Sequence, residues 1–288
     1  MRLKREDDAF MTGAAPDSSS PALPDYVKLI LAPNPSLLTG PGTNSFLVGG
    51  GQAGCVVIDP GPEHQGHLEA LARAAQAWGG LRAILITHGH SDHYEGAATL
   101  ARQTGAPILA WSREGTPVAD QELKDDQIID CGPDRLRVVY TPGHRFDHVS
   151  FLLEGARLLF AGDLVAGVGT VVIVPPEGNI GEYLASLRRL LALDLDLILP
   201  AHGPVVTAPH ARLQEYIDHR LLRERQILDA LRDGLDRIPA MVQRIYADVD
   251  PRLHGFAGES VRAHLLKLED EGRVAQREEQ GQIVWRLI

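Results

Sequence analysis

The segment Thr87–His93 concentrates residues that can bind metal ions. Its sequence, Thr-His-Gly-His-Ser-Asp-His, contains three imidazoles and one carboxylate, on His88, His90, Asp92 and His93. Imidazole combined with carboxylate suits a Lewis-acidic first-row divalent metal, zinc above all. The types and spacing of these side chains therefore predict a metal centre that activates water for hydrolysis.

Three further candidate ligands each follow an apolar run that predicts a β-strand, and each has a glycine beside it: His144, Asp163 and His202. A glycine lets the backbone turn sharply where a side chain must reach a metal. Together with the first cluster, these residues make five histidines and two aspartates. That set is large enough for two metal ions that share one carboxylate.

The elements that must position these ligands can be read from hydrophobic periodicity. Strands are predicted at Val27–Leu31, Ser45–Val48, Cys55–Ile58, Ala83–Ile86, Ile108–Trp111, Arg137–Tyr140, Val149–Leu153, Leu158–Ala161 and Leu195–Leu199. Helices are predicted at Gln65–Trp78, Tyr94–Gln103 and Glu182–Leu191. The acidic run Asp120–Asp126 is interpreted as a solvated loop. This order predicts a layered α/β sandwich with sheets inside and helices outside.

From Pro209 onward the pattern becomes helical. One long helix is expected over residues 210–232, followed by helices at Ala240–Ala247 and Glu259–Glu271 and a hairpin of Val274–Arg277 with Ile283–Leu287. Two helices followed by a two-stranded wing are typical of a small winged-helix domain. The predicted organisation is a flexible tail over residues 1–24, a catalytic domain over 25–207, and a helical linker with the winged helix over 208–288.

Composition narrows the class of protein. The 288-residue chain has a formal net charge of −10, which argues against a surface that generally coats nucleic acid or membranes. It has no apolar run of about 18 residues and no apolar segment behind its charged N-terminus, so neither a transmembrane helix nor a secretory signal is expected. The only cysteines, Cys55 and Cys131, are interpreted as reduced thiols. We therefore expect a cytoplasmic protein.

The motif His-x-His-x-Asp-His, followed by a His, an Asp and a His at later strand ends, resembles the metallo-β-lactamase-fold hydrolase superfamily over about residues 27–207. This resemblance implies an αβ/βα four-layer sandwich and two divalent ions, zinc first, with manganese or iron as alternatives. Transferred position by position, one ion is held by His88, His90 and His144. The other is held by Asp92, His93 and His202, and Asp163 bridges the two.

The resemblance also implies the chemistry of the site. Two ions about 3.5–4 Å apart share a hydroxide that acts as the nucleophile. Asp92 is the expected proton acceptor near that hydroxide, in addition to being a ligand. Asp59, in the sequence Ile58-Asp-Pro-Gly61, matches an aspartate that supports a ligand histidine from behind it. The alternative for Asp59 is a simple turn former.

The substrate is left open by these ligands. A second resemblance, to the β-lactamase-like protein 2 group, is carried by segments throughout the chain: Gly162–Thr170, Tyr183–Leu187, Pro200–Pro204, Tyr216–Arg220, Arg223–Ile227 and His264–Gly272. It implies an endonuclease that acts on single-stranded RNA. The alternative is an acyl hydrolase of small esters or thioesters, that is, a thioesterase or lactonase similar to hydroxyacylglutathione hydrolases. A remote alternative is a winged-helix regulator with a non-catalytic metal site.

Several features weigh on this choice. Asp163 stands where common zinc β-lactamases have a cysteine, which argues against β-lactam cleavage. Residues 233–288 contain eight basic and ten acidic side chains, so the winged helix is interpreted as a module for intramolecular packing or for a homodimer contact. Gly89 and Ser91 are expected to border the site entrance and to influence substrate choice. The other histidines, His148 among them, are assigned solvated or packing roles.

Overall fold

The computed structural model describes residues 21–288, so most of the predicted tail lies outside the described residues. The chain forms two compact units. The first contains the described residues up to Thr141 together with Asp147–Val171 and Leu191–Arg212, and the second contains Pro142–Phe146, Val172–Leu190 and Leu213–Ile288. The division therefore does not follow a single cut in the chain.

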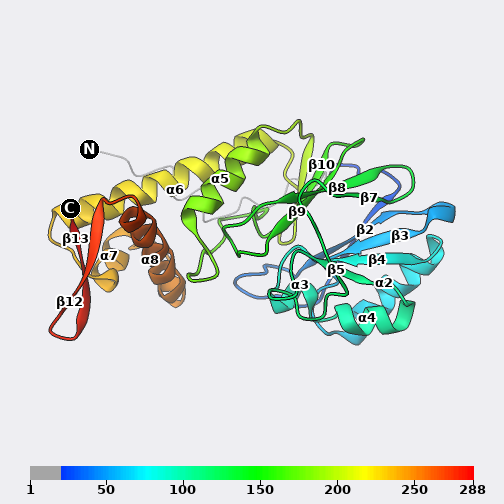
Figure 1. Ribbon diagram of the computed structural model, residues 1–288, viewed down its shortest axis with the longest axis horizontal. Coiled ribbons are helices and arrows are strands. Elements are labelled where there is room, and N and C mark those ends of the chain that lie inside the picture. The colour runs from blue at the N-terminus through cyan, green and yellow to red at the C-terminus, as the bar shows by residue number, and fades with distance from the viewer. Residues whose placement is uncertain (1–20) are drawn as a thin grey trace. The chain divides into compact units, whose positions relative to one another are not determined.

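The first unit opens with a six-stranded sheet in the order β1-β2-β3-β4-β5-β6. Its strands are β1 Val27–Leu31, β2 Asn44–Gly49, β3 Cys55–Ile58, β4 Leu81–Leu85, β5 Ile108–Ala110 and β6 Gln121–Glu122. The strands β3 to β6 run parallel, so their carboxyl ends meet at one edge of the sheet. The helices α2 Gln65–Ala77 and α4 Ala97–Thr104 cover one face (Figure 1), where Leu68 and Leu71 pack with Val57 and Ile84.

A five-stranded sheet in the order β11-β10-β9-β8-β7 completes this unit. Its strands are β7 Ile128–Asp130, β8 Arg135–Tyr140, β9 Val149–Leu153, β10 Leu158–Gly162 and β11 Leu197–Pro200. Alternate side chains of both sheets form one buried core, in which Phe46 and Phe160 make an edge-to-face contact with ring centroids 5.1 Å apart. The apolar strands of the sequence are therefore buried between two layers.

Two of these strands were not expected. Part of the acidic run interpreted as a loop forms β6, which pairs with β5, and Ile128–Asp130 forms β7 at an edge of the second sheet. Both segments are two or three residues long and mostly exposed. Such short edge strands carry too little apolar periodicity to be recognised from sequence.

The second unit contains the expected helices and hairpin. Its elements are α5 Ile180–Leu191, most of α6 Pro209–Arg232, α7 Ile238–Ile245, α8 His254–Asp270, β12 Val274–Glu279 and β13 Gln282–Leu287. Trp285 of the hairpin is buried against Val261 and Leu265 of α8 and Met241 of α7. The predicted winged helix thus has an apolar core of its own.

Two negative expectations concern the whole chain. Across residues 21–288 we find no helix with both the length and the apolar character needed to span a bilayer. Cys55 and Cys131 are free and buried, and burial is the main cause that raises the pKa of each thiol to about 11. Both thiols therefore have a packing role and little nucleophilic character at neutral pH.

Candidate metal centre

All seven predicted ligands lie directly beyond the ends of strands or in the short turn that follows. His88 and His90 come after β4, and the four-residue helix α3 Ser91–Tyr94 carries Asp92 and His93. The other three follow β8, β10 and β11, and they are His144, Asp163 and His202. The apolar strands lie in the core, and the polar residues that follow their ends come together at one place.

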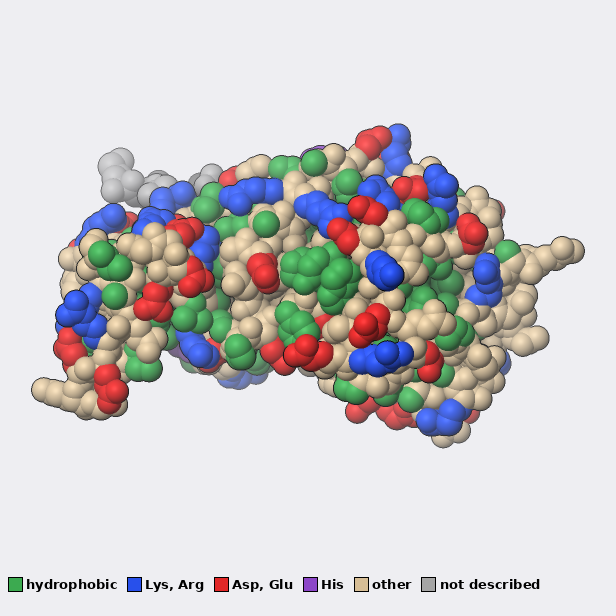
Figure 2. Space-filling model, in the orientation of Figure 1, with side chains coloured by type: hydrophobic (Ala, Val, Ile, Leu, Met, Phe, Trp, Pro, Cys, Tyr) green, Lys and Arg blue, Asp and Glu red, His purple; other side chains and the backbone are tan. Residues whose placement is uncertain are grey.

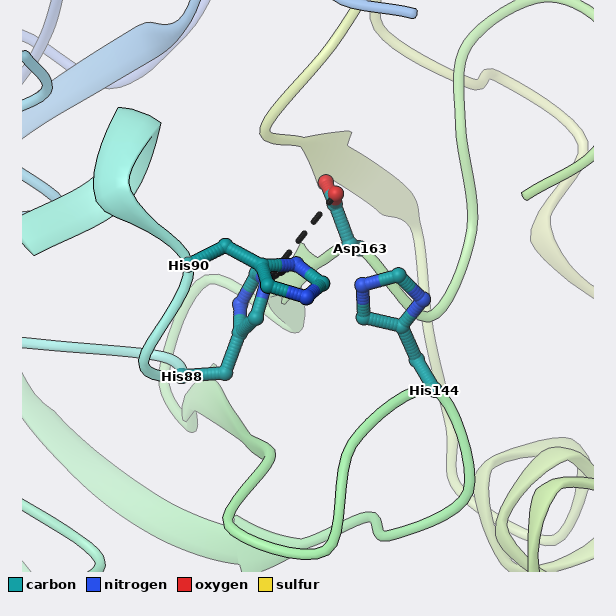
Figure 3. Close-up of side chains that lie close together, drawn as sticks. All are labelled: His88, His90, His144 and Asp163. Atoms are coloured by element: carbon teal, nitrogen blue, oxygen red, sulfur yellow. Dashed lines mark hydrogen bonds and ion pairs between the residues drawn. The ribbon is translucent and has the colours of Figure 1, made fainter. Parts of the chain in front are cut away.

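The structure brings these side chains together as two groups. In the first, His88, His90, His144 and Asp163 each offer a ligand atom, and these atoms lie within 4.8 Å of one another (Figure 3). In the second group, the ligand atoms of Asp92, His93 and His202 also lie within 4.8 Å of one another. Each group has the donor types and the spacing that could hold a metal ion.

Asp163 faces both groups. Its Oδ2 lies 4.0 Å from Nε2 of His88 and 3.5 Å from Nε2 of His93. Its Oδ1 lies 3.4 Å from Nε2 of His202. One carboxylate placed in this way can supply an oxygen to each of two neighbouring cations.

Most of the imidazoles use one ring nitrogen to bond the protein and present the other to the cluster. Nδ1 of His144 donates to the carbonyl of Val172 at 2.9 Å, and Nδ1 of His202 donates to that of Gly42 at 3.3 Å. These bonds fix the tautomer and leave Nε2 available. His90 differs from these two histidines, because its Nδ1 is the nitrogen that faces the cluster. This atom lies 2.9 Å from Nε2 of His88.

Asp59 holds the first ligand segment from behind. Its carboxylate accepts hydrogen bonds from the amide and the hydroxyl of Thr87, at 2.8 and 2.7 Å, and lies 2.8 Å from Nδ1 of His93. Asp59 is 2% exposed and has a positive φ of 49°, which is uncommon for a residue other than glycine. It both forms the turn and contacts a ligand histidine, so the two interpretations of Asp59 are compatible.

The charges of the cluster favour a bound cation. Burial opposes ionisation of His93, yet Asp163, Asp92 and Asp59 raise the pKa of its imidazolium well above the ordinary value. Burial also disfavours the Asp92 carboxylate, but His93 and His202 outweigh it and lower the pKa of Asp92 to about 2. Carboxylates packed around buried imidazoles attract positive charge, whether as protons or as metal.

One buried atom tests whether a metal fits. Nε2 of His93 is inaccessible to solvent and has no hydrogen-bond partner among residues 21–288, although Asp59 holds the other ring nitrogen. A buried polar atom without a partner is costly and calls for an explanation. A metal ion among His93, Asp92, His202 and Asp163 explains it, so the residues present fit a divalent cation.

Sequence reasoning assigned no functional role to two residues that contact the ligand segments. Asp147 accepts a hydrogen bond from the amide of Gly89, and His148, expected to be solvated or packing, accepts one from the amide of Asp163. Their position three and four residues after His144 was the available signal. Gly89 itself is closely packed, because an added Cβ would lie 1.9 Å from the carbonyl oxygen of Gly115.

Comparisons with known proteins agree with this architecture. Residues 38–202 match the model of the metallo-beta-lactamase superfamily, and residues 238–285 match that of the beta-lactamase associated winged helix domain. The chain is 32% identical to a beta-lactamase-like protein 2 homolog of Drosophila melanogaster, over 85% of this chain and 88% of that protein. It is 31% identical to an atrochrysone carboxyl ACP thioesterase of Aspergillus chevalieri, over 94% of this chain and 92% of that protein.

A solved structure supports the same fold along nearly the whole chain. It is a metallo-beta-lactamase family protein from Thermus thermophilus, which superimposes with a TM-score of 0.77 at 21% identity, over 93% of this chain and all of that one. The expected αβ/βα sandwich with a C-terminal winged helix is thereby confirmed. The chain belongs to the metallo-β-lactamase superfamily, and it is a hydrolase of that superfamily with a β-lactamase-associated winged-helix domain.

Proposed function

We propose that this protein is a dinuclear metal-dependent hydrolase of thioesters. The observation that carries the proposal is the similarity to a relative whose name states its reaction, an ACP thioesterase, across 94% of this chain. The seven ligand side chains provide the site, with His88, His90 and His144 at one ion, Asp92, His93 and His202 at the other, and Asp163 between them. Zinc suits this donor set best, and manganese or iron are the alternatives.

A loop beside the site supports an apolar acyl group. Residues 33–43 form a loop in which Asn34 bonds Thr43 through both its amide nitrogen and its amide oxygen, at 2.9 Å each. The same loop supplies the Gly42 carbonyl that holds His202. It exposes Leu37 and Leu38, with relative exposures of 63% and 52%. Exposed leucines in a loop that also contacts His202 favour an apolar substrate group over a phosphate backbone.

Different residues of the chain have different roles in the proposed hydrolysis. When bound, two divalent cations supply a water of lowered pKa and polarise the thioester carbonyl. Asp92, whose side chain is 28% exposed, stays ionised at neutral pH and accepts the proton of the attacking water. Water adds to the carbonyl carbon, the C–S bond breaks, and the leaving thiolate takes up the proton that Asp92 accepted, which returns Asp92 to its ionised form. Asp59 keeps Nε2 of His93 directed at the site throughout.

Cleavage of single-stranded RNA is the second candidate. The similarity to a beta-lactamase-like protein 2 homolog favours it, because the sequence resemblance to that group implied an endonuclease. Surface charge weighs against it: on the face shown in Figure 2, basic and acidic side chains are interspersed and form no continuous basic track. Phosphate-backbone binders concentrate lysine and arginine instead. We therefore place RNA cleavage second to thioester hydrolysis.

A substrate panel separates the two candidates. Protein of measured zinc or manganese content is assayed against acyl thioesters of increasing chain length, an aromatic acyl thioester, a lactone and a single-stranded RNA oligonucleotide, with Asp163→Ala as the matched control. We expect thioester turnover that the control lacks. RNA cleavage without thioester turnover would reverse the order of the candidates. Absence of all turnover by fully metallated protein would overturn the hydrolytic mechanism and favour a regulatory metal site.

A further inference from the structure

The dipeptide Asp147-His148 touches two ligand-bearing segments at once. It lies immediately before β9, and both side chains are buried, with relative exposures of 1% and 0%. Burial of a carboxylate and an imidazole is costly unless hydrogen bonds compensate for the lost hydration. The bonds that these two side chains make lead directly to the metal-binding cluster.

Asp147 is hydrogen-bonded to the segment that carries His88 and His90. Its Oδ2 accepts a hydrogen bond from the amide of Gly89 at 2.9 Å, and Gly89 stands between His88 and His90. The bond to a carboxylate is charge-assisted, so it restrains this peptide more strongly than a neutral acceptor does. The backbone of Gly115 packs closely against the same carboxylate. A Cβ added at Gly115 would lie only 1.9 Å from Oδ2 of Asp147. The peptide of Gly89 is thus held between Asp147 and the carbonyl of Gly115.

His148 is hydrogen-bonded to the segment that carries Asp163. Its Nε2 lies 3.1 Å from the amide nitrogen of Asp163, and a backbone amide can only donate. Nε2 must therefore be the acceptor, which places the ring proton on Nδ1. Nδ1 lies 2.9 Å from the hydroxyl of Thr141, which lies 3.0 Å from that of Ser150. The hydroxyls of Thr141, directly after β8, and of Ser150, in β9, thereby help to fix the orientation of the ring.

We propose that Asp147 and His148 are positioning residues for the metal centre, Asp147 for His88 and His90, and His148 for Asp163. The inference rests on the proposed metal-dependent function, because both residues act through ligands and neither is assigned as a ligand. The dipeptide couples the two ligand segments. A shift of either side chain moves the donor atoms relative to one another and weakens the metal binding.

The competing explanation is that Asp147 merely caps a loop and stabilises the fold. Asp134 provides a matched control, because its carboxylate also accepts backbone amides, from Arg135, Gly155 and Ala156 at 2.8 to 3.0 Å. It lies in the turn before β8, at the end of that strand opposite the segment that carries His144. Loss of Asp134 should therefore lower stability without affecting the metal centre.

The test compares metal affinity with stability in the full-length protein. The zinc dissociation constants of wild type, Asp147→Ala, Asp147→Asn, His148→Ala, His148→Gln and Asp134→Ala are measured by competition with a chromophoric chelator. The unfolding temperature of each chelated protein is measured in parallel. We expect Asp147→Ala and His148→Ala to weaken zinc binding about 10–100-fold, as loss of outer hydrogen bonds to metal ligands typically does. Asp147→Asn and His148→Gln keep an acceptor near the same place, so they should recover most of the affinity.

The outcomes distinguish this proposal from the proposed function. If Asp147→Ala and His148→Ala bind zinc as tightly as Asp134→Ala, and differ from wild type only in unfolding temperature, positioning is refuted and capping explains both residues. If wild-type protein binds zinc normally but cleaves no thioester, the substrate assignment fails and the positioning proposal still stands on the affinities. If wild-type protein binds no divalent metal, both proposals fail.

Discussion

Asp163 has a special place among the candidate ligands, because its carboxylate lies near imidazoles of both groups. Oδ2 lies near His88 and His93, and Oδ1 lies near His202. The sequence predicted a shared carboxylate at this position only through the family resemblance. In the structure the same assignment has a geometric basis, because Asp163 is the carboxylate whose ligand atoms approach both groups.

Removing a ligand should abolish turnover while leaving the fold largely intact. Asp163→Ala deprives both groups of an oxygen, and His90→Ala deprives the first group of a nitrogen. We expect the rate to fall by at least about 1,000-fold, because the lowered pKa of the nucleophilic water depends on the bound metals. Steady-state turnover is measured after reconstitution with zinc, with circular dichroism as the control for folding. Wild-type turnover in either variant would refute the metal assignment.

Close packing explains why residue 89 is a glycine, whereas the sequence alone placed Gly89 at the entrance of the site. The expectation was that Gly89 and Ser91 border the entrance and influence substrate choice. In the structure Gly89 has no room for a side chain, because the carbonyl of Gly115 lies 1.9 Å from the position of a Cβ. Ser91, in contrast, is exposed at the start of α3. The two spacers of the motif therefore have different physical roles.

A pair of alanine variants tests that difference. Gly89→Ala must displace the backbone that carries His88 and His90, so it should cost about 1–3 kcal/mol of stability and weaken zinc binding at least about 10-fold. Ser91→Ala should change both quantities by little, because its side chain is exposed. Chemical unfolding and chelator competition measure the two effects. Equal behaviour of the two variants would contradict the packing explanation.

At the scale of elements, α8 contains an unusual buried group. His264 is fully buried, and within the described part of the chain neither of its ring nitrogens has a hydrogen-bond partner. Burial lowers the pKa of its imidazolium well below the ordinary value, and the neighbouring charges of Arg220, Lys267 and Arg223, with His219, lower it further. Helical periodicity placed His264 in a helix correctly, but only the packing of α6 against α8 surrounds it with cations.

The stability of the second unit should therefore depend on pH. The unfolded chain binds a proton at His264 below about pH 6.5 and the folded chain does not, so stability is complete above that pH and falls as the pH decreases. The loss approaches about 1.4 kcal/mol per pH unit. Thermal unfolding between pH 8 and pH 5 measures it. His264→Leu, which cannot be protonated, should flatten the dependence, and an unchanged slope would assign the acid sensitivity to other groups.

At the scale of the whole molecule, charge is distributed unevenly. The chain has a net charge of −10, and it gathers imidazoles and carboxylates beyond the strand ends of the metal-binding cluster. Without a metal, the carboxylates of this cluster raise the pKa values of His93 and His202, although burial opposes that shift in both. Metal binding must then displace protons, so folding, metal affinity and pH are linked.

Metal removal should lower the stability of the folded protein. At a free metal concentration about 100 times the dissociation constant, binding stabilises by about 2.7 kcal/mol, which corresponds to about 5–10 °C in unfolding temperature. Because His93 and His202 must lose protons to bind metal, this difference should shrink as the pH falls from 8 to 6. Scanning calorimetry with and without a chelator measures it. A chelator-independent unfolding temperature at pH 8 would contradict metal binding by the native state.

The local sequence by itself determined the ligand types, the apolar strands before them and the order of helices and hairpin in the winged-helix domain. Those features depend on periodicity and on residue chemistry within a few positions, so they are visible without coordinates. The grouping of the seven candidate ligands came from the family resemblance, and only the tertiary structure decided which atoms they present and which residues hold them. The bonds of Asp59 to Thr87, Asp147 to Gly89 and His148 to Asp163 join residues far apart in the chain, and no local pattern encodes such partners.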